Sequence, residues 1–175
     1  MVELLDIPIP DRHLSVYDPA CGTGGMLSVA KEHLLDRAAT PEQKANVEKY
    51  VTVHGQELSP TNYAICQADL LIKSDQQARV HLGNSLIPHD PHSREPGDQL
   101  PEAKYRFDFM LSNPPYGKSW KSDQERMGGK QGLKDLRFVI EHNGEAEYSL
   151  ITRSSDGQML FLANMLSKMK KSTKL

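Results

Sequence analysis

The sequence predicts an α/β protein with a mostly parallel sheet flanked by helices. Apolar runs of strand length recur along the chain, at Leu14–Tyr17, Val51–Gly55, Ala78–Leu82 and Phe107–Ser112. Segments with helical spacing of apolar residues separate the first three runs. Turns rich in glycine or proline follow several of the runs. Such alternation builds a parallel sheet with right-handed crossovers, in which ligands bind outside the carboxyl ends of the strands.

Each predicted helix has a start signal or an apolar face. Leu27, Ala30 and Leu34 recur at helical spacing over Gly25–Arg37. Thr40-Pro41 and Ser59-Pro60 are an N-cap followed by a first-turn proline, so further helices start there. Two more helical segments are predicted at the ends of the chain: Met1–Leu5, as the last turn of a helix, and the amphipathic Asp156–Lys171.

Two long stretches lack a period. Residues 83–104 form a polar loop with four prolines. Residues 118–148 are polar and contain glycines, which predicts a mobile loop or lid rather than a packed element. The lysines of the last segment are predicted to be a solvated helix end that could contact phosphate: Lys168, Lys170, Lys171 and Lys174.

Composition sets the broad class. A chain of 175 residues with 38% hydrophobic and 25% charged residues suits one globular domain. The net charge of −2 gives no global signature of nucleic-acid binding. Two cysteines make no disulfide framework, no apolar run is long enough to cross a bilayer, and Met1–Pro10 lacks the basic residues of a signal peptide. A cytoplasmic protein without membrane association is therefore expected.

The first marked segment is Asp18–Met26, with the sequence Asp-Pro-Ala-Cys-Gly-Thr-Gly-Gly-Met. Its three glycines permit a tight strand-to-helix turn and close approach of a ligand. It is neither a dinucleotide fingerprint nor a P-loop, and Asp18 would serve a phosphate poorly. A carboxylate at this place suits the cationic end of S-adenosylmethionine. The alternative is a tight turn that binds no ligand.

Two further polar segments end strands on the same predicted edge. Glu57 follows the second strand, where an acid can bind ribose hydroxyls or, alternatively, cap the helix that starts at Ser59. Gly83-Asn84-Ser85-Leu86 follows the third strand. The Asn84 side chain can present its amide to an adenine edge, or simply form an ordinary Gly-Asn turn.

The second marked segment is Asn113-Pro114-Pro115-Tyr116-Gly117, directly after the fourth strand. The Asn113 side-chain oxygen and the Pro114 carbonyl can accept the two protons of an exocyclic amine and so make its nitrogen a better nucleophile. Pro114 and Pro115 stiffen the turn, and Tyr116 offers a face for stacking on an extruded base. The alternative is a strand-exit turn or a proline-rich docking peptide.

Other reactive side chains fit worse. Cys21 is expected to be a small filler, because this chemistry needs no covalent nucleophile. His89 and His92 have metal-like spacing but no nearby third ligand, so no metal site is predicted. The residues after the second segment could contact a nucleic-acid backbone or form a plain polar loop: Lys118, Trp120, Lys121 and Lys130.

The ordered set of motifs resembles adenine-specific DNA methyltransferases, and more narrowly the modification subunit of type I restriction-modification systems. The resemblance runs over essentially the whole chain. It implies a Rossmann-like S-adenosylmethionine-dependent methyltransferase fold, incomplete at both ends. It also implies N6 methylation of adenine in double-stranded DNA, with a specificity subunit that reads the sequence and a restriction subunit that joins the complex.

The resemblance also assigns residues by position. Asn113, Pro114, Pro115 and Tyr116 would hold the flipped adenine. Glu57 would hold the cofactor's ribose, and Asn84, where the family usually has Asp, would lie by its adenine. The remaining cofactor-binding positions are Asp18, Pro19, Ala20, Gly22, Thr23, Gly24, Gly25, Met26 and Ser85.

Family members have a cofactor-binding segment and a helical domain before the part that matches, and further strands after it. Against that pattern the chain is expected to be a truncated product or a fragment, with a bare edge at Phe107–Ser112. Alone it would be poorly soluble or dimeric, and inactive. Two other functions stay open: methylation of a cytosine amine or a protein glutamine, and a cofactor-binding scaffold without catalysis.

Overall fold

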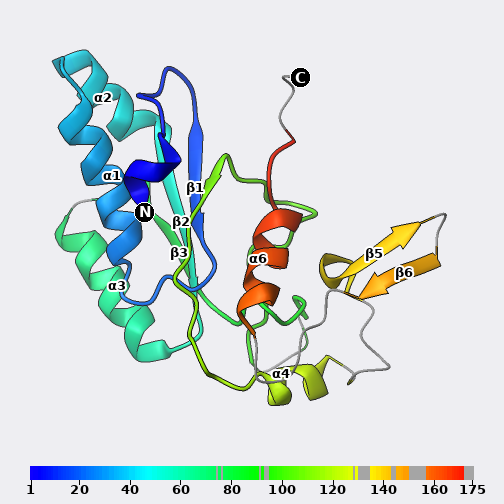
Figure 1. Ribbon diagram of the computed structural model, residues 1–175. Helices are drawn as coiled ribbons and strands as arrows, with labels where there is room; N and C mark the ends of the chain where they lie inside the picture. Colours follow the sequence, from blue (N-terminus) through cyan, green and yellow to red (C-terminus); the bar gives the residue numbers. More distant parts are fainter. Residues whose placement is uncertain are drawn as a thin grey trace.

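A four-stranded parallel sheet in the order β3-β2-β1-β4 forms the centre of the computed structural model (Figure 1). Its strands are β1 (Leu14–Asp18), β2 (Val51–Glu57), β3 (Arg79–Leu82) and β4 (Phe109–Met110). The structure describes residues 1–73, 75, 77–90, 92, 95–127, 129, 135–142, 145–149 and 157–171, with side chains omitted for 140–142 and 145–149.

The register brings the strand ends to one edge of the sheet. Leu14 pairs with Val51 and Asp18 with Gly55, while Glu57 pairs with Leu82 on the other side of β2. Val16, Val51 and Val53 are fully buried in the main apolar cluster, whereas residues between them along the strands, such as Ser15 and Thr52, are only partly buried. The predicted edge with Asp18, Glu57 and Gly83 therefore exists.

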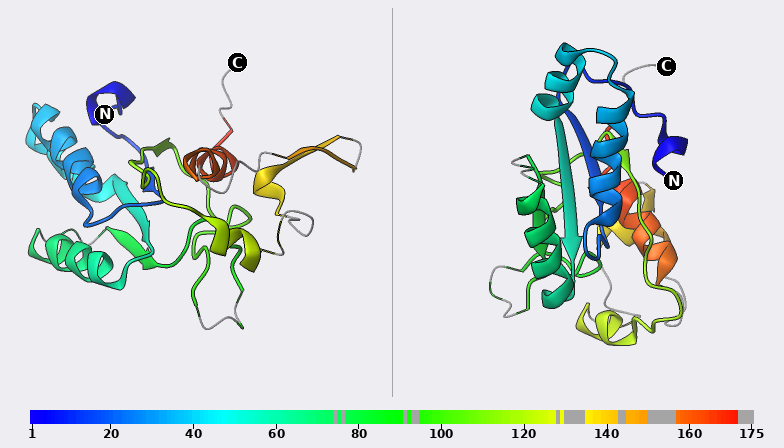
Figure 2. Two further views of the ribbon diagram at one scale, coloured as in Figure 1. Left: turned by 60° about the horizontal axis from the view of Figure 1, so that its bottom comes forward. Right: turned by 90° about the vertical axis from the view of Figure 1, so that its left-hand side faces the viewer.

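Three helices cover one face of the sheet: α1 (Gly25–Arg37), α2 (Pro41–Tyr50) and α3 (Pro60–Ile72). The predicted caps are confirmed, because the Thr40 and Ser59 hydroxyls accept from the backbone amides of Gln43 and Asn62. The sheet lies between these helices and α6 (Gln158–Ser167), as the left view of Figure 2 shows. The predicted last helical turn at the start of the chain is a 3₁₀ helix over Val2–Leu5.

The fourth strand is shorter than predicted, and its edge is not entirely bare. At Asp108 the backbone amide still donates to the Ser15 carbonyl at 3.2 Å, and the carboxylate accepts from both the amide and the hydroxyl of Ser15. Beyond it, Phe107 forms a parallel bridge with Met169. The Phe107 amide donates to the Lys168 carbonyl, and the Phe107 carbonyl accepts from the Lys170 amide. The end of the chain thus covers the edge at Phe107.

In the described part of residues 118–148, the prediction that this stretch holds no packed element is wrong. The described part contains α4 (Lys121–Arg126), a 3₁₀ helix (Leu136–Phe138) and an antiparallel hairpin of β5 (Val139–His142) and β6 (Glu145–Ser149). Trp120 and Phe138 are buried against Leu160 of α6 in a second apolar cluster. The apolar residues that fix this stretch are isolated in sequence, so they produce no period.

The last helix also differs from its prediction. It ends at Ser167, and Asp156, its predicted start, lies outside the described residues, as does Lys174. Lys168 is fully buried, so the prediction of a solvated end is wrong for this residue. Lys170 instead makes an ion pair of 2.6 Å with Asp108.

Candidate functional site

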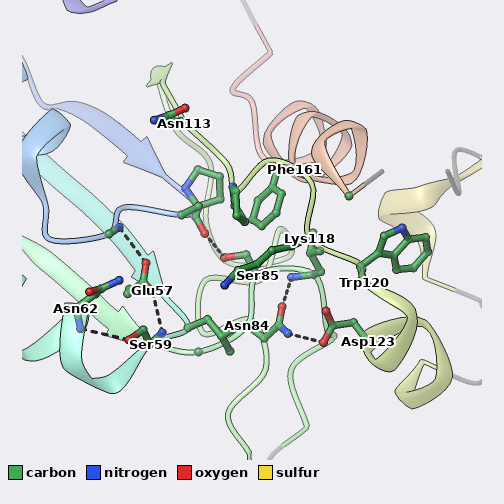
Figure 3. A pocket seen from close by; sticks show the side chains of 18 of the residues that line it. Glu57, Ser59, Asn62, Asn84, Ser85, Asn113, Lys118, Trp120, Asp123 and Phe161 are labelled. Atoms are coloured by element: carbon green, nitrogen blue, oxygen red, sulfur yellow. Dashed lines mark hydrogen bonds between the residues drawn. The ribbon is translucent and has the colours of Figure 1, made fainter. Parts of the chain in front are cut away.

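A pocket of about 490 Å³ lies outside the carboxyl ends of the strands. Both marked segments contribute to its wall: Pro19, Ala20 and Gly22 from the first, and Asn113 and Pro115 from the second. The end of β2, the turn at residues 83–86 and the α4 region complete it (Figure 3). The structure therefore brings together the segments that the sequence placed on one edge.

The glycine turn is held by backbone bonds to the neighbouring strand. The Cys21 amide donates to the Gln56 carbonyl over 3.1 Å, and the Gly24 amide to the Cys21 carbonyl over 2.8 Å. Gly22 and Gly24 have φ angles of 57° and 84°. A Cβ on Gly24 would lie 2.5 Å from Cys66 Sγ, whereas one on Gly22 would meet nothing within 4 Å. The turn is thus closed on its inner side and open toward the pocket.

Asp18 lies beneath this turn, fully buried and not in the pocket wall. One carboxylate oxygen accepts from the Ala20 amide at 2.9 Å, and the other has no hydrogen-bond partner among the described residues. Burial raises the pKa of Asp18 to about 7, although the Ala20 amide and the Ser112 side chain oppose the shift. Because Asp18 lies behind the pocket wall, it can act on a ligand through its charge rather than by direct contact.

Glu57 accepts hydrogen bonds from two backbone amides. One carboxylate oxygen accepts at 2.7 Å from the amide of Ser59, the N-cap residue of α3. The other accepts from the Gly22 amide at 2.9 Å and ties the glycine turn to the end of β2. Each carboxylate oxygen can accept a second bond. Because Glu57 also lines the pocket, it can still receive a ligand's hydroxyls.

The turn after β3 is held from inside. The Asn84 side-chain oxygen accepts from the Leu86 amide at 3.0 Å, and its nitrogen donates to Asp123 at 2.9 Å. The Ser85 hydroxyl donates to the Pro19 carbonyl at 2.6 Å. Asn84 and Ser85 both line the pocket, but both side chains already bond to other parts of the protein. Ser85 therefore connects this turn to the glycine turn.

The second marked segment is much more open. Asn113 and Pro115 are exposed and line the pocket, whereas Pro114 and Tyr116 do not. Tyr116 is 72% exposed to solvent. Of the first segment, Thr23 and Gly25 are exposed outside the pocket wall, and Gly24 and Met26 lie behind it.

A buried network of charged side chains supports the pocket from behind, and no sequence pattern predicted it. Arg137 Nη1 donates to Asp98 at 2.6 Å and to the Ser85 carbonyl at 2.8 Å. Its Nη2 pairs with Asp135, and Lys168 donates to the same Asp98 oxygen at 2.6 Å. These partners are up to 70 residues apart, so no local pattern could reveal them. Burial lowers the pKa of Lys168 to about 8, against the pull of Asp98.

The cysteines pack beside the glycine turn. Cys21 and Cys66 are both free and buried. Contact with Cys66, together with burial, raises the pKa of the Cys21 thiol well above its usual range. A thiol held in this form is a poor nucleophile, which agrees with the predicted role as filler.

The remaining candidates are placed as follows. Lys118 is exposed in the pocket wall, Trp120 is buried, and Lys121 lies 3.9 Å from Glu125 on the surface. Lys130 lies outside the described residues. Within the described part, no group of three His, Cys, Asp or Glu side chains could hold a metal ion. The described helices include none long and apolar enough to span a membrane.

This fold is that of the S-adenosylmethionine-dependent methyltransferases. It aligns with a type I restriction-modification methyltransferase subunit from Streptococcus thermophilus at a TM-score of 0.63, with 20% identity, over 97% of this chain and 30% of that one. A modification subunit of a putative type I restriction enzyme from Vibrio vulnificus gives 0.62, with 24% identity, over 99% and 30%. A putative class I methyltransferase from Listeria monocytogenes gives 0.58, with 14% identity, over 97% and 40%.

The family follows from the sequence. The profile of the N-6 DNA methylase family matches residues 1–174, and the chain belongs to this family. It is 27% identical over 139 residues to the type II restriction enzyme and methyltransferase RM.BcgI of Heyndrickxia coagulans, covering 79% of this chain and 19% of that protein. The type I MjaIX methylase subunit of Methanocaldococcus jannaschii is 26% identical, over 86% and 23%. The chain thus spans less than a quarter of these relatives.

Proposed function

We propose that this chain carries the catalytic core of a DNA methyltransferase that transfers a methyl group from S-adenosylmethionine to the N6 amine of adenine. The observation that carries the proposal is the shared pocket. The glycine turn and Glu57 form one side of it, and Asn113 and Pro115 reach it from the other. Cofactor and target amine would meet across a single cavity.

The cofactor side supplies binding and electrostatics. S-adenosylmethionine brings a methyl group on a sulfonium, which is already activated for transfer. Glu57 would accept from the ribose hydroxyls while it holds Gly22 in place. The open side of Gly22 lets the ligand approach the backbone closely. The carboxylates of Asp18 and Glu57 make the turn a favourable place for a cationic ammonium and sulfonium.

The target side would activate the amine without a covalent intermediate. Asn113 Oδ1 and the Pro114 carbonyl would accept its two protons and return electron density to the nitrogen. Because adenine is stacked within a duplex, it must first be extruded, at a cost of a few kcal/mol. Tyr116, exposed at this place, would stack on the extruded base. The amine would then face the cofactor across the pocket.

The chain would work inside a larger assembly. It spans less than a quarter of the relatives above, and its net charge of −2 provides no general attraction to DNA. We therefore assign sequence reading to a specificity subunit, and place the chain in the modification subunit of a cytoplasmic type I system that also has a restriction subunit. Alone, it is expected to be inactive.

The test is transfer of a labelled methyl group from S-adenosylmethionine to duplex DNA by the chain assembled with a specificity subunit. Digested DNA should contain N6-methyladenine. Asn113→Ala should abolish transfer and leave cofactor affinity unchanged. A product of N4-methylcytosine or of methylated glutamine would contradict the assigned substrate. Cofactor binding without transfer in the full assembly would indicate a scaffold.

A further inference from the structure

Two carboxylates from described residues line the pocket, and they differ in what they still can accept. Glu57 uses both oxygens for backbone amides, those of Gly22 and Ser59. Asp123 of α4 uses only Oδ1, which accepts from Asn84. In the described part of the chain its Oδ2 has no hydrogen bond and is not sealed from solvent. Asp123 is therefore the pocket carboxylate with a whole oxygen available to a ligand.

The order of the strands determines what lies near Asp123. The glycine turn ends β1, Glu57 ends β2, and the turn with Asn84 follows β3, in that order along the edge. A ligand with its amino-acid end at the glycine turn and its ribose at Glu57 extends its base toward β3. There it meets Asn84 and Asp123, whose side chains are joined by a dashed line in Figure 3.

Asn84 is already held on both sides of its amide. Its oxygen accepts from the Leu86 amide, and its nitrogen donates to Asp123. The effect of these bonds is to orient Asp123. Burial raises the pKa of the Asp123 carboxyl, and the bond from Asn84 opposes that shift. A partly buried carboxylate of this kind gains more from a new donor than one in open water.

We propose that Asp123 is the specificity-determining residue for the cofactor, and that its Oδ2 accepts from the exocyclic amine of the cofactor's adenine. Asn84 is the positioning residue that holds the carboxylate in place. This inference rests on the proposed function, because it names the contact made by the base end of the same ligand. The competing possibility is that Asp123 only fastens α4 to the β3 turn.

A pair of ligands separates these roles: S-adenosylhomocysteine, and S-inosylhomocysteine, in which an oxo group replaces the amine. Their affinities are measured by calorimetry on the full chain. The wild type should prefer the amino ligand by about 10- to 100-fold, the range for a hydrogen bond to a charged group. Asp123→Asn should reduce this preference to less than about threefold, because the new amide can donate to the oxo group.

Two variants serve as controls. Glu125→Gln changes an exposed acid on the same helix and should leave the preference unchanged. Asn84→Ala removes the tie but keeps the carboxylate, so both affinities should fall while the amino ligand remains preferred. If Asp123 only fastens α4, Asn84→Ala and Asp123→Asn should behave alike.

The outcomes are distinct from those for the proposed function. A wild-type preference that survives Asp123→Asn overturns the role of Asp123 and leaves the methyltransferase assignment intact. Failure of the wild type to bind either ligand overturns both.

Discussion

The two sides of the pocket differ in how firmly the protein holds them. On the cofactor side, the glycine turn is tied to β2 through Gln56 and Glu57, and to the β3 turn through Ser85. On the target side, Asn113, Pro115 and Tyr116 are exposed. The proposed cofactor side is thus held by internal hydrogen bonds, whereas the proposed target side presents its groups to solvent. A base extruded from DNA would supply the missing contacts.

This difference determines how much ordering each side requires when its ligand binds. A preformed turn does not need to be ordered when a small ligand binds, so the ligand keeps more of its contact energy. An exposed segment gains its contacts only with the correct partner in place. Four substitutions test this difference between the two sides, given in order of decreasing expected effect.

Arg137→Met should destabilise the protein most. It removes the guanidinium that holds the Ser85 carbonyl and pairs with buried Asp98 and partly buried Asp135. Loss of one member of a buried ion pair costs about 3–5 kcal/mol. Urea unfolding measures the change. Arg126→Met, which breaks a surface pair with Glu95, should cost less than about 1 kcal/mol; equal losses would contradict the structural role of the network.

Gly24→Ala compares the two sides directly when set against Gly117→Ala. Both glycines have positive φ, so each substitution costs about 1–2 kcal/mol of backbone strain. Only at Gly24 would the new Cβ meet another atom, Cys66 Sγ at 2.5 Å. The clash adds about 1–3 kcal/mol. In thermal or urea unfolding, Gly24→Ala should therefore be much less stable than Gly117→Ala. Equal stabilities of the two variants would show that the glycine turn is not tightly packed.

Asp18→Asn should stabilise the free protein in a pH-dependent way. The pKa of Asp18 rises from 3.8 to about 7 on folding, so the folded state holds a proton that the unfolded state has lost. Stability from this group is full below pH 3.8 and falls as the pH rises to about 7. The advantage of Asn should be roughly 2 kcal/mol larger at pH 8 than at pH 5. A difference that does not vary with pH would place the carboxylate in a solvated site.

Tyr116→Ala should have the smallest effect on the protein itself. Because the ring is exposed, unfolding free energy should change by less than about 0.5 kcal/mol, and cofactor affinity should stay the same. Methyl transfer to DNA in the assembled enzyme should fall about 5- to 100-fold, the range for loss of one stacking platform. A large loss of stability instead would mean that Tyr116 belongs to the packed structure.

The parts that sequence predicted well are those with local signals. Thr40-Pro41 and Ser59-Pro60 mark helix starts by short-range chemistry, and the glycine turn and Asn113 segment are contiguous motifs. The failures lie where contacts are distant in sequence. Trp120 and Phe138 pack against α6, and Arg137 and Lys168 both bind Asp98. No periodicity or residue spacing in the sequence predicts either set of contacts. Asn84 shows the intermediate case, because its place was predicted but its bond to Asp123 was not.

If the cofactor side forms without DNA, the chain alone should bind S-adenosylmethionine. Calorimetric titration of S-adenosylmethionine into the wild-type chain and into Glu57→Gln measures this binding. We predict one site in the wild type, and a loss of affinity of about 10-fold or more in Glu57→Gln, whose neutral amide replaces one acceptor by a donor. Absence of binding to a folded wild type, or equal affinity in both proteins, would contradict a preformed cofactor site at the glycine turn.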